Sequence, residues 1–465
     1  MMHSLRVMTI ATLSLATAAL VGCGDDDPPN NENKSCSVQA QSGCGTGLVC
    51  EEVEGGDPTC FSPVAFKGKV VNALDDKPVQ GARIVARDAN DAAVSPVAIS
   101  AADGTYTLHV PAKRNAEGKP LPAKLTLRAD ASSYQTFPVA PRIALPIDVD
   151  TATGSPPVVQ NASTDIALVP LQNASGLGSI AGHVVADEGV DLVAAGALVV
   201  AGESTGIVDF DGNFVVFNVP VSTTVDVKAY AAGLQIGPKT VAVEAGKETG
   251  NVELHITSAA TAEISGKLSI VNGNGFSTTS VVLALEDTFV ENVARGEVPK
   301  GLRAGGVTGD FLFKGVPDGK YVVLAAFEND GLVRDPDTSI GGTQIVHVEV
   351  AGQNITLAEG FKVTGSLATE SPGKDGIEEV TGTPTFVWAD DSSEDRYEVR
   401  VFDAFGVKVW EDLAVPSVSG SKTVSVAYGG EALIPGMIYQ FRATSIKGDT
   451  PIAQTEDLRG VFIAR

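Results

Sequence analysis

One pattern recurs three times between residues 64 and 361, and it constrains the possible folds more than any other feature of the chain. Each copy has a β-branched stretch containing a glycine, then a turn of aspartate and glycine, then an alternating stretch that ends in Val-Pro. The copies place these signals at Gly68, Asp103-Gly104 and Val110-Pro111; at Gly182, Asp211-Gly212 and Val219-Pro220; and at Gly266, Gly309-Asp310 and Val316-Pro317. The recurrence predicts three similar β-rich domains in series.

The turns and the residues beside them predict strands and their orientation. Apolar and polar residues alternate around each turn, as expected of half-buried strands. We expect Asp103-Gly104 and Asp211-Gly212 to form two-residue hairpin turns, because glycine adopts the positive φ that such turns need. Tyr106 and Phe214 follow two residues after these glycines, on the face that points into the core. The proline of each Val-Pro pair ends its strand because it cannot donate to the ladder.

The order of these signals resembles the prealbumin-like (transthyretin-like) regulatory domain that accompanies carboxypeptidase catalytic domains. The resemblance implies a small antiparallel β-sandwich of seven or eight strands in each of the predicted domains 64–171, 177–258 and 262–361. The third copy departs most, since residues 277–280 stand where the first copy has Pro-Val-x-Gly-Ala. The resemblance is to the accessory domain alone and brings no catalytic residues with it.

The last predicted domain, 362–465, has a different pattern. Trp388 stands in an early strand, Tyr397 begins an alternating strand, and Leu433 to Tyr439 reads LIPGMIY. These residues resemble a fibronectin type III sandwich, which implies that the Tyr439 hydroxyl bonds back to the nearby chain. The 50 glycines and 25 prolines fit many turns between short strands. The predicted fold class is therefore all-β, with tandem antiparallel β-sandwiches.

The first residues of the chain read as an export signal. A short basic start and an apolar run too short to cross a bilayer make residues 1–22 a signal peptide. The stretch Leu20-Val21-Gly22-Cys23 resembles the lipobox of bacterial lipoproteins, which implies a diacylglycerol on Cys23 and removal of the preceding segment. The alternative is an ordinary signal peptide, with Cys23 incidental. Gly24 favours outer-membrane sorting, so we expect a lipid-anchored protein of a Gram-negative bacterium, facing the periplasm or the cell surface, with residues 23–35 as an acidic tether.

Four further cysteines lie in residues 36–60 and none lies beyond them. They are Cys36, Cys44, Cys50 and Cys60. A segment this short cannot bury enough apolar surface to fold unaided, and an exported protein favours two disulfides. Zinc is the alternative, although the spacing lacks a CxxC pair and a nearby histidine. Three disulfide connectivities remain open.

The composition bears on partners. A formal net charge of −24 disfavours binding to nucleic acid, because such a surface repels phosphate backbones. The partners that remain are the membrane, through the N-terminal lipid, and envelope proteins or glycans. We expect a non-enzymatic structural or adhesive protein whose sandwiches form a semi-rigid rod. The alternatives are an array of carbohydrate-binding modules and a scaffold for an envelope complex.

The chain offers no catalytic constellation that sequence reasoning supports. Outside the signal segment the histidines stand singly in β-rich stretches, namely His109, His183, His255 and His347. Gly202 to Gly206 fits G-x-S-x-G, but a strand follows instead of the helix of a nucleophile elbow, so we interpret it as a loop. The DFDGN stretch at residues 209–213 lacks the spacing of a calcium loop. We therefore expect no enzyme activity, no cofactor and no metal site.

Aromatic residues could support the glycan alternative only if they lay on the surface. We expect Trp388 and Trp410 in the core of the last domain, and Tyr106 and Tyr321 in the cores of the repeats. Tyr134 and Tyr230 match a late strand position of the prealbumin-like family. None of these residues offers a spare platform for a sugar ring.

Overall fold

The computed structural model describes most of the chain after the tether. The described residues are 36–38, 41–89, 92–139, 142–188, 194–271, 273, 275–291, 295–325, 331–334, 345–391 and 393–465. The signal segment, Cys23 and the tether lie outside this part. Within it, no helix has the length and apolar character needed to cross a membrane. The described residues form four β-sandwiches and a small N-terminal segment, which we call the knob (36–38 and 41–62).

The first sandwich consists of two four-stranded sheets that enclose an apolar core. One sheet contains β3 (Val64–Asn72), β6 (Thr105–Val110), β9 (Val158–Val159) and β10 (Ile166–Leu168); the other contains β4 (Arg83–Arg87), β5 (Ala98–Ile99), β7 (Lys124–Asp130) and β8 (Ile147–Asp148). Two short 3₁₀ helices, η1 (Val149–Thr151) and η2 (Ala162–Thr164), lie between the last strands.

The second sandwich repeats this topology. One sheet has the order β14 (Asn213–Pro220), β11 (Leu177–Ala186), β18 (Glu248–Ala259) and β16 (Leu234–Ile236); the other has the order β13 (Ser204–Ile207), β12 (Leu198–Ala201), β15 (Ser222–Tyr230) and β17 (Lys239–Val243).

The third sandwich has the same arrangement again. One sheet contains β22 (Asp310–Val316), β19 (Ala262–Val271), β27 (Phe361–Gly365), β24 (Leu332–Arg334) and β26 (Ile355–Thr356). The other contains β21 (Arg303–Val307), β20 (Thr279–Leu285), β23 (Gly319–Ala325) and β25 (Val346–Val350). The 3₁₀ helix η3 (Glu286–Thr288) follows β20. The expected boundary at residue 361 falls on the first residue of β27, which pairs with β19.

The predicted fold class of all-β tandem sandwiches is confirmed, but the strands are not uniformly antiparallel. In each repeat the glycine-containing strand pairs in parallel with a late strand: β3 with β10, β11 with β18, and β19 with β27. This pairing is possible because most of the sandwich lies between the two strands in sequence and supplies the crossover that parallel neighbours require.

The Asp-Gly turns differ from the predicted hairpins. β13 before Asp211-Gly212 pairs with β12, whereas β14 after it pairs with β11 in the opposite sheet. The same holds for Asp103-Gly104, which lies between β5 and β6. Both glycines have positive φ, at +77° and +84°. The turn is thus a corner between sheets, because a glycine of positive φ serves a corner as well as a hairpin and the sequence does not distinguish the two.

The glycine in the first strand of each repeat lies opposite an aromatic residue. Gly68 pairs with Tyr106, Gly182 with Phe214, and Gly266 with Phe311. A Cβ on Gly182 would overlap both the Phe214 ring and the carbonyl oxygen of Val252. The glycine therefore makes room for the ring and for the parallel strand. The predicted inward orientation of Tyr106 and Phe214 is confirmed, since both are buried.

The fourth sandwich pairs a three-stranded sheet with a six-stranded sheet. These are β28 (Thr369–Ser371), β30 (Thr385–Ala389) and β33 (Thr423–Ala427), and β29 (Glu378–Val380), β36 (Val461–Ala464), β34 (Ile438–Lys447), β31 (Arg396–Asp403), β32 (Lys408–Pro416) and β35 (Thr450–Gln454). Trp388 is buried, as predicted, and packs against Tyr397. Trp410, also expected in the core, is half-buried at its edge beside Phe386. The Tyr439 hydroxyl accepts a hydrogen bond of 2.9 Å from the Ile434 N–H, which confirms the predicted corner.

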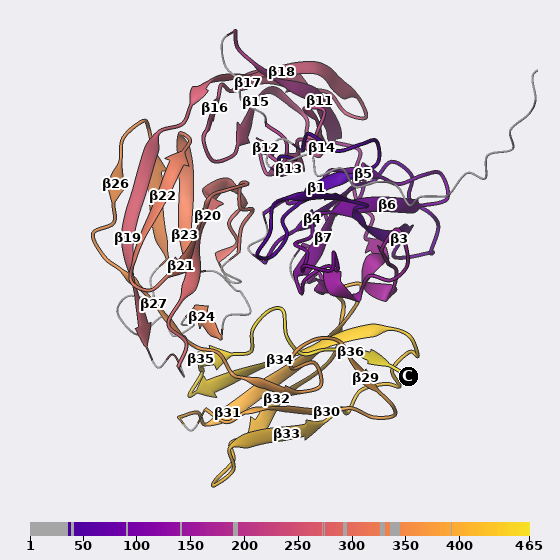
Figure 1. The fold of residues 1–465 in the computed structure, drawn as a ribbon, viewed down its shortest axis with the longest axis vertical. Coiled ribbons are helices and arrows are strands. Elements are labelled where there is room, and N and C mark those ends of the chain that lie inside the picture. Colours follow the sequence, from indigo (N-terminus) through magenta and orange to yellow (C-terminus); the bar gives the residue numbers. More distant parts are fainter. Residues whose placement is uncertain are drawn as a thin grey trace, which may run out of the picture.

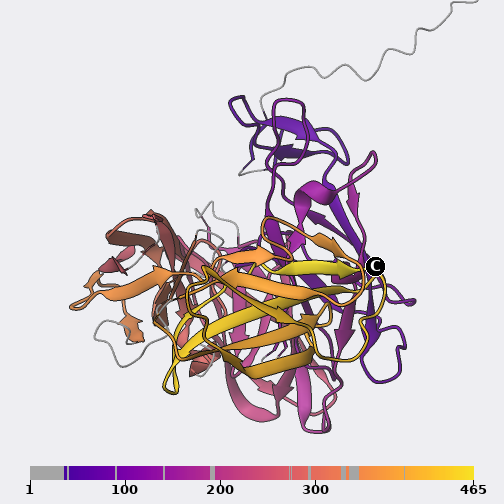
Figure 2. The ribbon, with the colours of Figure 1, turned by 90° about the horizontal axis from the view of Figure 1, so that it is seen from below.

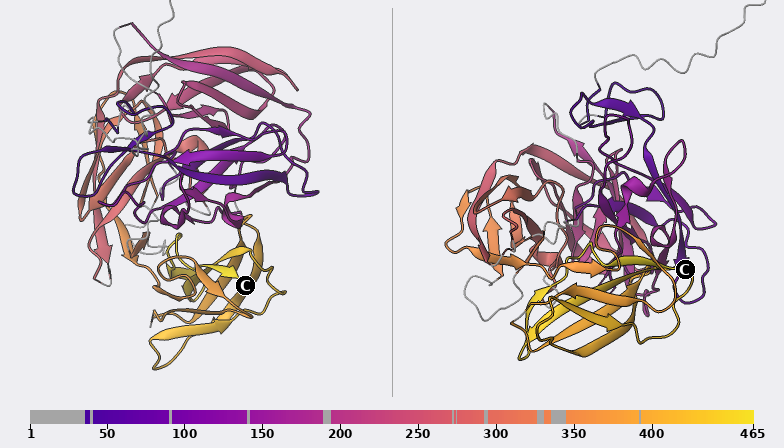
Figure 3. Two further views of the ribbon diagram at one scale, coloured as in Figure 1. Left: turned by 45° about the vertical axis from the view of Figure 1, so that its right-hand side comes forward. Right: turned by 60° about the horizontal axis from the view of Figure 1, so that its bottom comes forward.

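The four sandwiches form a closed arrangement, and the expectation of a rod is wrong. In Figure 1 the first sandwich lies at the right, the second at the top, the third at the left and the fourth at the bottom. The oblique views of Figure 3 show the same closed grouping. The strand β12 explains part of it. Val199 packs into the core of the second sandwich, whereas Leu198 and Val200 join the core cluster of the third. A strand with apolar residues on both faces must be covered on both.

The knob stands away from the plane of the sandwiches, beside the first of them (Figure 2). Its strands β1 (Val49–Glu51) and β2 (Thr59–Phe61) form a hairpin. Disulfides join Cys36 to Cys50 and Cys44 to Cys60, which selects one of the three connectivities that the sequence left open. The sulfurs of Cys36, Cys44 and Cys50 lie within 4.8 Å of one another, but zinc binds thiolates, and sulfurs joined in disulfides are not thiolates.

Candidate functional site: an ion network where three sandwiches meet

The central feature of the molecule arises from the polar face of β7. Its apolar residues Leu125 and Leu127 point into the first sandwich, and the alternate residues Thr126, Arg128 and Asp130 point outward. In an isolated sandwich this outer face would be exposed to water. Here it is covered, and the Arg128 side chain has no exposed surface.

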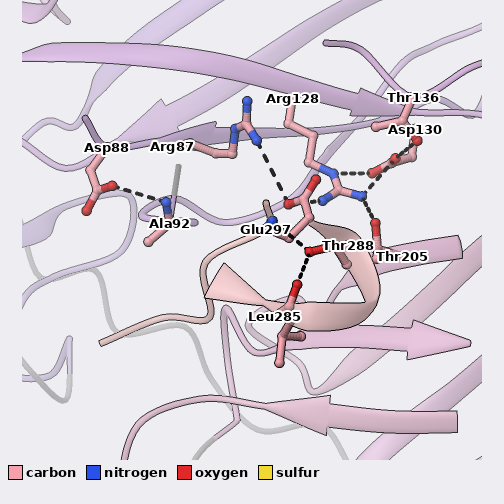
Figure 4. Close-up of polar contacts among 10 residues, drawn as sticks. All are labelled: Arg87, Asp88, Ala92, Arg128, Asp130, Thr136, Thr205, Leu285, Thr288 and Glu297. Atoms are coloured by element: carbon pink, nitrogen blue, oxygen red, sulfur yellow. Dashed lines mark hydrogen bonds and ion pairs between the residues drawn. The ribbon is translucent and has the colours of Figure 1, made fainter. Parts of the chain in front are cut away.

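Arg128 binds groups from three sandwiches (Figure 4). Its Nε and Nη2 donate to the two carboxylate oxygens of Asp130 at 2.8 and 3.1 Å, within its own strand. Nη1 donates to Glu297 of the third sandwich at 2.6 Å, and Nη2 also donates to the Thr205 hydroxyl of the second sandwich at 2.7 Å. One guanidinium therefore connects all three bodies, which its planar set of five donors makes possible.

Other polar groups hold the two carboxylates in place. The Thr136 hydroxyl donates to Asp130 at 2.7 Å. The Glu297 N–H donates to the Thr288 hydroxyl at 2.9 Å, and that hydroxyl donates to the Leu285 carbonyl at 2.8 Å. These contacts are visible in Figure 4. They fix Glu297 on the loop after β20, where it faces Arg128.

The charges in this network are balanced. Burial by itself would lower the pKa of the Arg128 guanidinium, but the carboxylates of Asp130 and Glu297 outweigh that effect and hold the pKa above its ordinary value. Arg87 of β4 adds a second cation, with its Nη1 at 3.9 Å from Glu297. A buried charge that is paired and hydrogen-bonded in this way is costly to unpair.

The first and second sandwiches are joined again by Asn218 of β14. Its side-chain amide donates to the carbonyls of Ala131 and Tyr134 at 3.0 and 2.7 Å, and its oxygen accepts from the Ser133 N–H at 2.8 Å. Asn218 has a φ of +59°, a conformation that asparagine tolerates better than most residues. On the same junction Asp209 lies 3.5 Å from Arg83 and accepts the N–H groups of its own corner. The Asp209 carboxylate of the DFDGN stretch thus stabilises both its own corner and the junction with the first sandwich.

The second and third sandwiches meet through two tyrosines. Tyr230 and Tyr321 pack edge to face, with ring centroids 6.3 Å apart. Tyr321 is buried, as predicted, and its hydroxyl donates to the Pro317 carbonyl at 2.9 Å. The Lys300 ammonium donates to the Ala195 carbonyl at 2.9 Å across the same junction.

The fourth sandwich closes the arrangement against the first and the third. The Arg142 guanidinium donates to the Phe405 carbonyl at 2.7 Å and stacks over Phe137 at 4.9 Å. Arg295 of the third sandwich forms an ion pair with Asp457, which also accepts from Arg442 at 2.7 Å. Each junction therefore contains an arginine or lysine that reaches into the neighbouring sandwich.

A cleft of about 650 Å³ lies between the first and fourth sandwiches. Charged groups line it, and its two cations are already paired. Lys124 pairs with Asp148, whereas Arg459 lies 3.8 Å from Asp375 and 3.6 Å from Glu456. Lys124 is the first residue of β7, so the cleft extends the polar face of this strand toward the fourth sandwich.

The histidines of the repeats lie apart, and three of them have a polar partner. The Nδ1 atom of His183 contacts Asn213, that of His255 contacts Asp187, and that of His347 contacts Glu286, at distances of 2.7–3.0 Å. His109 is exposed on β6. The structure brings none of these four together among the described residues.

The G-x-S-x-G match was expected to form a loop. Instead, Ser204 is the first residue of strand β13. Gly202 and Glu203 form the two-residue turn between β12 and β13, with Gly202 at a φ of +64°. The Ser204 hydroxyl donates to the Asn218 carbonyl at 3.0 Å. Its role in this structure is to hold the end of a hairpin.

We predict that Ser204→Ala changes stability only slightly and removes no activity. The substitution deletes one half-buried hydrogen bond, which contributes about 1 kcal/mol. Thermal unfolding measures the first part, and ester and peptide hydrolysis assays measure the second. Turnover by the purified protein that disappears in the variant would show that Ser204 is a nucleophile.

The residues of the ion network were not identified from the sequence. Arg128 and Asp130 alternate on a strand with apolar neighbours, which is the ordinary pattern of a solvent-facing surface. Two charges on a strand face, opposite in sign and two residues apart, were the one available signal. It gave no indication of Glu297, which lies far along the chain.

Comparisons with known proteins give no family for this chain. No family model matches the sequence, and no curated protein matches it.

Solved structures align with it only loosely. The Bacillus anthracis TIE protein is 12% identical over 86% of this chain and 72% of its own, with a TM-score of 0.17. A DUF3823 family protein from Bacteroides ovatus is 12% identical over 43% and 98%, with a TM-score of 0.21. BcpA, the major pilin subunit of Bacillus cereus, is 11% identical over 65% and 99%, with a TM-score of 0.17. TM-scores of this size support no conclusion about function.

Proposed function

We propose that this chain is a non-enzymatic cell-envelope protein, tethered to the outer membrane by a lipid on Cys23, whose four sandwiches act as one rigid head for structural or adhesive contacts. The observation that carries the proposal is the Arg128 network, because one fully buried guanidinium joins three sandwiches. Modules that folded and moved independently would not share a buried ion network. Surface loops at the ends of the sandwiches would then be held at fixed mutual positions.

The resemblances in the sequence support the same assignment. Each repeat has the Val-Pro pair and the inward aromatic residue on which the prealbumin-like resemblance depends. The Tyr439 hydroxyl makes the bond that the fibronectin type III resemblance implies. The disulfide-linked knob fits an oxidising compartment outside the cytoplasm. A lipid at Cys23 would place this knob next to the membrane, with the head beyond it.

Cys23→Ala tests the anchor. We predict that the variant loses its lipid and leaves the membrane fraction, because several acyl chains each contribute about 0.8 kcal/mol per buried methylene. The measurement is membrane partition after a carbonate wash, together with the mass of the N-terminal peptide.

The matched control is Cys44→Ala, which removes a cysteine of the knob and leaves the lipobox residues unchanged. It is expected to stay in the membrane fraction. Membrane retention of the Cys23 variant would contradict the proposed anchor. Protease treatment of intact cells then reports whether the head faces outward or into the periplasm.

A further inference from the structure

The knob is docked on the first sandwich through a buried ion pair. Glu51 of β1 and Arg114 each have a side chain that is 3% exposed, and Arg114 Nε donates to Glu51 Oε2 at 2.5 Å. The other Glu51 oxygen accepts from the Ala112 N–H at 3.0 Å. Arg114 also donates to the Ser62 carbonyl at 3.0 Å and lies over the Phe61 ring at 4.9 Å.

The backbone of the knob takes part in the same contact. The Arg114 N–H donates to the Glu52 carbonyl, and the Glu54 N–H donates to the Arg114 carbonyl, both at 2.8 Å. All of the knob residues in this contact lie between Glu51 and Ser62. The docked segment is therefore the β1–β2 hairpin and the residues beside it.

This hairpin is short and depends on its cross-links. Only three residue pairs join β1 and β2, and one of them is Cys50 with Cys60. A two-stranded hairpin of this size is at best marginally stable in water. The contact with Arg114 does not by itself compensate for burying Glu51, since burial outweighs the Arg114 pairing and leaves the pKa of that carboxyl above its ordinary value.

The two disulfides differ in what they enclose and in how accessible they are. The loop closed by Cys36–Cys50 ends before Glu51, whereas the loop closed by Cys44–Cys60 contains Glu51. Cys36 and Cys50 are buried, with exposed fractions of 8% and 1%. Cys44 and Cys60 are only half-buried. The disulfide that holds the docking segment is thus also the one that an external thiol can reach.

We propose that Cys44–Cys60 is a redox-sensitive lock that holds the knob on the first sandwich. A dithiol reductant would attack one sulfur as a thiolate and form a mixed disulfide, which its second thiol then resolves. The reductant leaves as a disulfide, and Cys44 and Cys60 gain its two electrons and two protons as thiols. The hairpin then opens and Glu51 leaves Arg114.

Release of the lock lengthens the connection to the head. Residues 51–60 fold back as a hairpin in the locked form, and extended they would span on the order of 30 Å at about 3.3 Å per residue. This consequence for reach rests on the proposed lipid anchor at Cys23, but the release itself does not. The redox state of Cys44 and Cys60 would then determine whether the head is docked on the knob or connected to it by a longer, flexible segment.

The test titrates the purified oxidised protein with dithiothreitol. Differential alkylation and mass spectrometry measure which pair opens first, and hydrogen exchange follows the Arg114 and Glu54 amides. We expect Cys44–Cys60 to open about tenfold faster than Cys36–Cys50, because access governs the rate of thiol exchange. Exchange of both amides should accelerate by at least about tenfold at the same reductant concentration.

A matched pair of variants separates the two bonds without reductant. Cys44→Ser with Cys60→Ser should release the amides, whereas Cys36→Ser with Cys50→Ser should leave them protected. Earlier opening of Cys36–Cys50, or protected amides once Cys44–Cys60 is open, would overturn the proposal. Loss of the anchor is measured separately by the mass of the N-terminal peptide, so failure of the lock and failure of the proposed function are distinguishable.

Discussion

Arg128→Met is expected to open the arrangement of the four sandwiches. Methionine keeps much of the side-chain volume but leaves the carboxylates of Asp130 and Glu297 without their shared cation. Removing one partner of a buried ion pair costs about 3–5 kcal/mol, mostly because the remaining charges are left unpaired. The loss falls on the contacts that join the first sandwich to the second and third. Small-angle X-ray scattering should show a larger radius of gyration, and calorimetry should show separate transitions at lower temperature.

The control for this prediction is Arg400→Met. Arg400 pairs with Glu398 and Glu411 on the fourth sandwich, but its side chain is 34% exposed. Exposed ion pairs contribute about 0–1 kcal/mol, so this variant should keep the scattering profile of the original protein. A double variant, Arg128→Met with Asp130→Asn, should recover part of the loss because it removes one unpaired carboxylate and leaves Glu297 its contact with Arg87. Unchanged scattering and melting of the single Arg128 variant would refute a structural role for the network.

Gly182→Ala is expected to destabilise the second sandwich by about 3 kcal/mol, at the upper end of the usual cost of overpacking. The added methyl group would overlap the Phe214 ring and the carbonyl oxygen of Val252, so two strands must move apart. The carbonyl oxygen belongs to the parallel neighbour β18 and cannot rotate away as a side chain can. Thermal unfolding of the whole chain, with hydrogen exchange to locate the change, measures the effect.

Gly176→Ala provides the comparison. An added Cβ there would meet no described atom within 4 Å, and its φ is not in the left-handed region. Its expected effect is close to zero or slightly stabilising, since alanine restricts the unfolded chain. Equal effects at Gly176 and Gly182 would show that close approach of strands is not the reason for glycine in the repeated motif.

Much of each sandwich could be predicted from local sequence. The alternation in β6 and β14, the positive φ of Gly104 and Gly212 and the inward aromatics depend on residues near one another in the chain. The Tyr439 corner is equally local, because its partner Ile434 is five residues away. Such features follow from backbone sterics and strand periodicity, which operate over a few residues.

Other features could not be predicted because the deciding partner is remote. Whether Asp211-Gly212 forms a hairpin or a corner depends on which strand lies beside β14, and that strand is β11. The polar face of β7 has the pattern of a surface strand, and only its burial against Thr205 and Glu297 makes it a junction. The connectivity of Cys36 with Cys50 and Cys44 with Cys60 was one of three possibilities, and only the folded structure selects it.

The sequence by itself determined that this chain is all-β, that it repeats one sandwich three times, and that its cysteines gather in a short N-terminal segment. Tertiary structure alone decided that the sandwiches close on one another and that Arg128 joins three of them. The physical reason is that strand formation and core packing depend on the spacing of apolar residues along the chain. Docking between folded units depends instead on complementary surfaces, whose members are scattered through the sequence.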